Sequence, residues 1–126
     1  MGRSLGAAVA IDLASRKKVG GLVAQSAFTT AFRVLTQVPL LPWDKFRNIS
    51  KITRVNCPVL IMHGRADEVI PFSHAEKLFA AAKEPKRAYW VERGDHNNLQ
   101  MFAGKRYFEE LSEFAARLDA AAAAGK

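Results

Sequence analysis

The stretch CPVLIMHGRADEVIP, residues 57–71, decides the fold. Its first half is a short run of apolar, mostly branched side chains closed by Gly64, which is typical of a parallel strand buried on both faces. Asp67 lies in the loop just after this expected strand. Residues 57–71 are therefore expected to form a buried parallel strand with a carboxylate in the loop that follows it.

Expected strands and helices alternate along the whole chain. Apolar runs predict strands over residues 21–25, 59–63 and 87–91, and helical patterns cover residues 5–14, 73–83 and 102–122, with a connection over residues 28–56. Such alternation predicts a parallel sheet with flanking helices in a single domain, residues 1–126. In the last helix, apolar side chains recur at steps of mostly three and four residues and should pack on the sheet: Phe108, Leu111, Phe114, Ala115 and Leu118.

Residues 2–6, GRSLG, have the form G-x-S-x-G of a nucleophile elbow. In such a turn the small residues let strand and helix approach closely, and the hydroxyl of Ser4 projects from the bend. The backbone N–H of Leu5, at the start of the following helix, would point at the oxyanion. The motif by itself is weak, because Ser4 could equally be the N-cap of that helix.

A serine hydroxyl is a poor nucleophile without a base and an orienting acid. Asp67 and His96 are the candidates, each in a loop that follows an expected strand. The chain order is then Ser4, Asp67, His96, which is the order of the α/β-hydrolase triad.

The chain resembles the C-terminal part of α/β-hydrolase-superfamily proteins, in the branch of compact esterases and peptidase-like hydrolases. Three blocks carry the resemblance: residues 2–6, residues 57–71 and the Gly-Asp-His-Asn at 94–97. It implies that Ser4 is the nucleophile, His96 the general base and then acid, and Asp67 the group that orients the imidazole. The fold class implied is α/β, with about three parallel strands and flanking helices.

The resemblance also implies that several strands normally precede the elbow, together with a loop that donates the second oxyanion-hole N–H. Without that donor, activity is expected to be lower by about a hundred- to a thousand-fold unless another chain supplies it. The strand at residues 21–25 should then be an unpaired edge, and exposed edges invite pairing with another chain. We expect two copies to join there about a two-fold axis, as a homodimer or part of a larger homo-oligomer.

The connection at residues 28–56 falls where the superfamily often places its cap. By that resemblance, four apolar side chains would line an acyl pocket: Phe28, Phe32, Leu40 and Trp43. Ordinary packing is the alternative. A short apolar insertion favours short- to medium-chain esters over long lipids. Esterase, thioesterase and peptidase chemistry use the same triad, so the residues do not separate them.

Each candidate also has a purely structural interpretation. Asp67 could cap a turn, His96 could be an ordinary loop residue, and Asp95 is the runner-up for the acid. His63 is expected to hydrogen-bond to the loop beyond its strand, and His74 to be a surface or interface residue. If the triad does not work, the chain would be a catalytically silent module for structure or interaction.

Composition fits a globular domain: 126 residues, 49% hydrophobic and 25% charged. The net charge of +7 is dispersed, with no aromatic-interleaved basic motif, so a solvated surface is expected rather than nucleic-acid binding. The histidines and the single Cys57 show no metal-ligand spacing, and we expect neither metal nor cofactor. With no apparent signal peptide, no bilayer-length apolar run and no possible intrachain disulfide, the expected location is the cytoplasm.

Overall fold

The computed structural model describes residues 1–3, 5–27, 48–96 and 98–124. Its core is one sheet of four parallel strands in the order β1-β2-β3-β4. The strands are β1 (Gly2–Arg3), β2 (Leu22–Gln25), β3 (Val59–Gly64) and β4 (Lys86–Val91). The predicted α/β class with a parallel sheet is confirmed.

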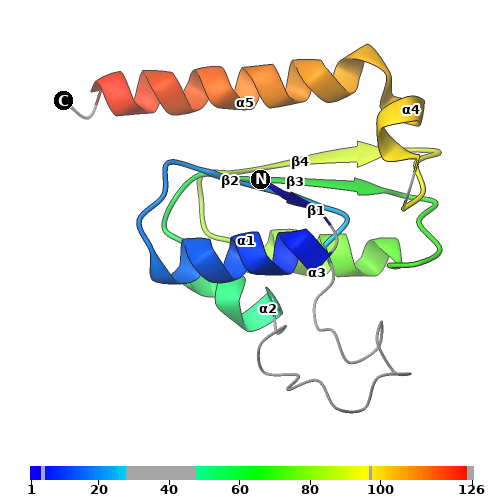
Figure 1. Ribbon diagram of the computed structural model, residues 1–126, viewed down its shortest axis with the longest axis horizontal. Coiled ribbons are helices and arrows are strands. Elements are labelled where there is room, and N and C mark those ends of the chain that lie inside the picture. The colour runs from blue at the N-terminus through cyan, green and yellow to red at the C-terminus, as the bar shows by residue number, and fades with distance from the viewer. Residues whose placement is uncertain (4, 28–47, 97, 125–126) are drawn as a thin grey trace.

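Helices cover both faces of this sheet (Figure 1). On one face lie α1 (Leu5–Arg16), α2 (Asn48–Lys51), the 3-10 turn η2 (Ile52–Arg54) and α3 (Phe72–Ala81). The other face carries α5 (Lys105–Ala124), which α4 (Leu99–Ala103) connects to β4. Within the described part of the chain, no helix combines the length and apolar character needed to cross a bilayer.

Strand β3 is buried along its whole length, as its apolar sequence predicts. Val59 and Ile61 pack with side chains of α1 and α3, whereas Leu60 and Met62 pack with Phe114 of α5. The alternation follows from the two-residue period of a strand, which sends successive side chains to opposite faces. β3 therefore joins the two helical layers into one core.

The sheet has four strands where about three were expected. The additional strand, β1, is only two residues long and pairs with the second half of β2, Gly2 with Ala24 and Arg3 with Gln25. The edge predicted at residues 21–25 is therefore partly covered. A Cβ at Gly2 would collide with the backbone of Gly6, which confirms the predicted close approach of strand and helix at the G-x-S-x-G motif.

The single C-terminal helix predicted over residues 102–122 is two helices, because Gly104 adopts a left-handed conformation with φ of 59°. The predicted buried face is also partly wrong. Tyr107 and Phe114 are buried, but Phe108 is 56% exposed and packs edge-on against Tyr107. Ala115 is exposed as well. The buried face of α5 therefore begins at Tyr107, one residue before the position that the pattern of apolar residues predicted.

The connection expected over residues 28–56 contains α2 and η2 at its end. These elements have four and three residues, which is too short for a periodic pattern to show. The proposed pocket residues Phe28, Phe32, Leu40 and Trp43 lie outside the described residues.

Gly64, the last residue of β3, brings the loops after β3 and β4 into contact. A Cβ at Gly64 would meet the carbonyl group of Gly94, with no room to move. We expect Gly64→Ala to lower the free energy of unfolding by about 1–3 kcal/mol, the usual cost of overpacking. Gly20→Ala is the matched control, because a Cβ there has no neighbour within 4 Å. Urea denaturation of both variants checks this, and equal effects would contradict the close contact.

Candidate functional site

Asp67 is fixed in the loop that follows β3. Its Oδ1 accepts hydrogen bonds from the backbone N–H groups of Val69 at 2.9 Å and Ile70 at 2.7 Å. The side chain is fully buried. Since both N–H groups hold the same oxygen, Oδ2 remains available to another donor.

That donor is His96, from the loop after β4. Its Nδ1 lies 3.1 Å from Asp67 Oδ2, and its side chain is 14% exposed. An ionised carboxylate only accepts, so the proton of the neutral ring is on Nδ1. Nε2 then carries the lone pair, which is the form that a general base requires.

The two residues are 29 positions apart in sequence and meet because β3 and β4 are parallel neighbours. Their carboxyl ends lie at the same edge of the sheet, where α/β proteins bind ligands. The loops are also joined directly: Arg65 N–H donates to the Val91 carbonyl at 2.9 Å, and Ala66 N–H to the Gly94 carbonyl at 3.0 Å.

The G-x-S-x-G turn reaches the same place. The guanidinium of Arg3 donates to the backbone carbonyl of His96 at 3.1 Å. Leu5 is the first residue of α1, so its N–H belongs to the helix start, which lacks partners within the helix. Ser4 lies between them but outside the described residues. The structure therefore brings Asp67, His96 and the neighbours of Ser4 to one edge of the sheet. The catalytic roles of Ser4, Asp67 and His96 stay a prediction.

His63, the penultimate residue of β3, lies buried behind the carboxylate. Its Nε2 is 2.8 Å from the Ile70 carbonyl, which confirms the expected bond to the loop, and 3.4 Å from Asp67 Oδ2. Burial lowers the pKa of the ring below its usual value, and this outweighs the opposing effects of the Ile70 bond and the Asp67 charge. The neutral ring is the stable form in the folded protein.

The pKa direction of His63 predicts a pH dependence of stability. Because the folded-state pKa is lowered from 6.5, the unfolded chain binds more protons just below that pH. Stability should therefore fall as pH decreases through about 6.5, by at most about 1.4 kcal/mol per pH unit from this group. Urea unfolding of wild type and His63→Gln at pH 7.5 and 5.5 isolates the contribution. The same pH dependence in both proteins would refute it.

The structure also fixes the positions of Asp95 and His74. The carboxylate of Asp95 accepts from the backbone and side-chain amides of Asn98 at 2.9 and 3.1 Å, so it holds its own turn. His74 was expected at the surface or in an interface, and the surface alternative is wrong, since α3 buries its side chain along with those of Ala75 and Leu78.

Two adjacent buried polar residues at the end of β2, Gln25 and Ser26, were not among the candidates predicted from the sequence. Gln25 is buried and accepts a hydrogen bond from the Tyr107 hydroxyl at 2.7 Å. Ser26 is fully buried with φ of 54°, a rare conformation for a residue other than glycine, and its Oγ has no partner among the described residues. The available signal was a pair of adjacent polar residues at the end of an otherwise apolar strand, Gln25 as its last residue and Ser26 as the next.

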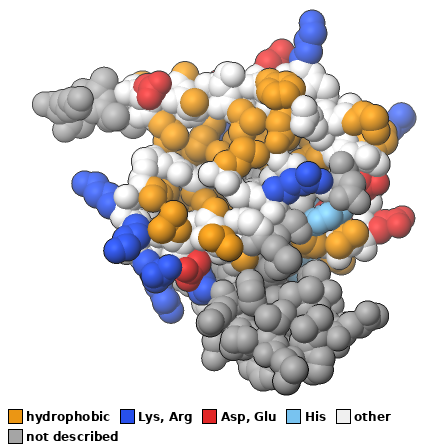
Figure 2. All heavy atoms as spheres, in the orientation of Figure 1, with side chains coloured by type: hydrophobic (Ala, Val, Ile, Leu, Met, Phe, Trp, Pro, Cys, Tyr) orange, Lys and Arg blue, Asp and Glu red, His pale blue; other side chains and the backbone are white. Residues whose placement is uncertain are grey.

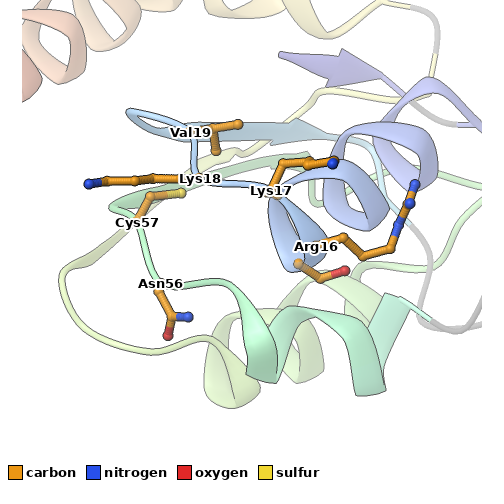
Figure 3. A pocket seen from close by; sticks show the side chains of 8 residues that line it. Arg16, Lys17, Lys18, Val19, Asn56 and Cys57 are labelled. Carbon is orange, nitrogen blue, oxygen red and sulfur yellow. The ribbon is translucent and has the colours of Figure 1, made fainter.

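The described residues also line a pocket of about 380 Å³, shown in Figure 3. It lies between the end of α1 and the segment that enters β3, and so belongs to the amino ends of the strands. The Lys17 and Lys18 side chains point in opposite directions, so they do not converge on a common ligand. Burial raises the pKa of Cys57, and its thiol is not activated.

The chain is similar to known hydrolases over most of its length. The prolyl oligopeptidase family model matches residues 28–117. Alpha/beta hydrolase domain-containing protein 17B from Homo sapiens and that from Xenopus laevis are each 36% identical over 118 residues. The match covers 92% of this chain and 40% of each relative, so the chain spans about two fifths of their length.

Two solved structures show the same fold. The esterase domain of a Rhodothermus marinus protein has a TM-score of 0.77 at 21% identity, covering 92% of this chain and 58% of that one. An esterase of Pyrococcus furiosus has a TM-score of 0.76 at 17% identity, covering 93% and 52%. These likenesses show the α/β-hydrolase fold.

Proposed function

The chain belongs to the prolyl oligopeptidase family, with the α/β-hydrolase fold, and on that premise we propose that it is a serine hydrolase that cleaves carboxylic esters through an acyl-enzyme. The observation that carries the proposal is the hydrogen bond between His96 Nδ1 and Asp67 Oδ2 at the carboxyl edge of the sheet. The Arg3 contact to His96 supports it, because it ties the residue before Ser4 to the loop of the base.

In the proposed reaction, Ser4 Oγ attacks the ester carbonyl while His96 Nε2 takes the hydroxyl proton. The Leu5 N–H stabilises the oxyanion, and Asp67 stabilises the positive imidazolium. His96 then protonates the departing alcohol, which leaves an acyl group on Ser4. A water molecule then attacks that acyl group while the same Nε2 takes its proton. His96 returns this proton to Ser4 Oγ as the bond to the acyl group breaks, which releases the acid and restores the free enzyme.

The ester class is proposed as short- to medium-chain. Support comes from the short apolar connection in the sequence and from the esterases among proteins of the same fold. Turnover of nitrophenyl esters of increasing acyl length tests the proposal. We expect the highest kcat/KM for the shorter chains, and a clear preference for long chains would overturn this choice.

A fluorophosphonate probe tests the nucleophile itself. The folded protein should form a covalent adduct that peptide mass spectrometry assigns to Ser4. Heat-unfolded protein is the control, because only a base-activated serine reacts quickly with this probe. If the folded protein shows neither adduct nor ester turnover, the alternative of a catalytically silent structural or interaction module is favoured.

We further propose that two copies associate at the β1–β2 edge. Among the described residues, Leu22 and Val23 have no partner in β1, and a strand edge without a partner supports pairing with another chain. Figure 2 shows apolar side chains gathered on the face between α5 and α1. Val9 and Leu13 of α1 are 66% and 47% exposed. Light scattering should give a dimer at micromolar concentration, and a monodisperse monomer would refute the association.

A cytoplasmic location is also proposed, supported by a lone buried cysteine that needs no oxidising compartment. Fractionation of cells expressing the tagged protein tests it, with recovery in the membrane pellet as the contrary outcome.

A further inference from the structure

His63 has no role in the proposed reaction, yet it lies directly against the proposed acid. Its side chain is fully buried, with Phe72 beside it at 6.2 Å between ring centroids. Nε2 is the ring atom that faces the carboxylate loop, 2.8 Å from the Ile70 carbonyl and 3.4 Å from Asp67 Oδ2. The ring is therefore placed between the core and the group that orients His96.

The protonation of this ring follows from its partners. A carbonyl oxygen only accepts, so the 2.8 Å contact to Ile70 places a proton on Nε2. Nδ1 has no partner among the described residues and is buried, which disfavours a second proton there. His63 is thus a neutral N–H donor. Its hydrogen is directed mainly at Ile70 and lies within reach of Asp67.

Three residues then form a closed ring of contacts. His63 Nε2 holds the Ile70 carbonyl, Ile70 N–H holds Asp67 Oδ1, and Asp67 Oδ2 lies 3.4 Å from His63 Nε2. Rotation of the carboxylate would break a contact on both of its oxygens. The orientation of Oδ2 toward His96 is therefore set by these three contacts together with the hydrogen bond to His96 itself.

We propose that His63 is a positioning residue, which as a neutral donor fixes the Asp67 loop so that Oδ2 faces His96. The inference deepens the proposed function and rests on it for its kinetic consequence. A neutral donor suits this place because it holds the carboxylate without a second positive charge that would compete with the imidazolium formed on His96. It acts through Asp67 and does not touch substrate.

The experiment compares His63→Gln with His63→Asn in the full chain. A glutamine amide can place its nitrogen near the position of Nε2, whereas the shorter asparagine cannot. We expect kcat for a nitrophenyl ester to stay within about threefold of wild type in His63→Gln and to fall about 10- to 100-fold in His63→Asn, with KM unchanged in both. The rate of fluorophosphonate labelling should follow kcat.

A second readout does not depend on activity. The proton between His96 Nδ1 and Asp67 Oδ2 should give a downfield NMR resonance in wild type, identified by its loss in Asp67→Asn. It should persist in His63→Gln and be broadened or lost in folded His63→Asn. If wild type neither labels nor turns over ester, the proposed function fails, while this resonance still tests the positioning role.

Several results would overturn the proposal. An unchanged resonance and unchanged kcat in His63→Asn would show that the donor is not needed. Equal loss of kcat and of the resonance in His63→Gln and His63→Asn would show that only the imidazole shape matters, as in ordinary packing. If His63→Asn does not fold, His63→Gln decides alone, because loss of its resonance in a folded protein contradicts the proposal.

Discussion

Ser4→Ala is expected to abolish both fluorophosphonate labelling and ester turnover, with kcat lower by about 10⁶-fold, as found when a triad serine is removed from a serine protease. The reason is that no other group in the proposed reaction can form the acyl-enzyme. Arg3 and Leu5 on either side of the position keep their places in β1 and α1, because alanine has a smaller side chain and the same backbone freedom. Thermal unfolding should therefore change little.

The matched control is Ser73→Ala, a change at an exposed serine in the first turn of α3. It should label and turn over like wild type. Turnover that survives in Ser4→Ala at the wild-type rate would reject Ser4 as nucleophile. Ser26, the buried serine at the end of the neighbouring strand, would then be the next residue to replace.

The strand at the centre of the sheet could be predicted from sequence because its pattern depends only on burial. Residues 59–62 are all apolar, and the structure buries every residue of β3 from Val59 to Gly64. The ends of such strands were therefore predictable to within a residue or two. The loops that follow them had to meet at one edge once the sheet was known to be parallel.

The C-terminal helix shows where a pattern of apolar residues is insufficient. Phe108 and Tyr107 are adjacent aromatics, and a count of apolar positions assigns the inward place to phenylalanine. Tyr107 takes it instead, because its hydroxyl finds the buried acceptor Gln25. A buried tyrosine needs such a partner, and the partner is 82 residues away, beyond the reach of local periodicity.

Order along the chain, rather than proximity to His96 in sequence, predicts Asp67 as the orienting acid. Asp95 is adjacent to His96 in sequence, but both of its oxygens accept from Asn98 in the same turn. Asp67 reaches Nδ1 from a different loop. The sequence predicts the bond of His63 to the loop after β3. It does not indicate that the same Nε2 lies 3.4 Å from Asp67 Oδ2, because a strand pattern carries no information on distances within the following loop.

Asp67→Asn is expected to lower kcat by about 10⁴-fold while the fold is kept, the size of effect that the same change has in serine proteases. The geometry gives the reason. Val69 and Ile70 N–H both donate to Oδ1, so the asparagine carbonyl must occupy that position and its NH₂ the position of Oδ2. That NH₂ faces His96 Nδ1, two donors cannot bond, and the ring proton must move to Nε2. The base then has no lone pair for the Ser4 proton.

Asp95→Asn provides the comparison. It makes the same chemical change at the residue next to His96, and it leaves the Asp67 partner of His96 Nδ1 unaltered. Its kcat should stay within about tenfold of wild type, since an amide keeps the size of the side chain and the bond between His96 Nδ1 and Asp67 is left in place. Circular dichroism of both variants separates loss of folding from loss of chemistry. A larger drop in Asp95→Asn than in Asp67→Asn would assign the orienting acid to Asp95. If the Asp67→Asn protein keeps the wild-type kcat, the tautomer of His96 does not control the reaction. That result would overturn the proposed triad.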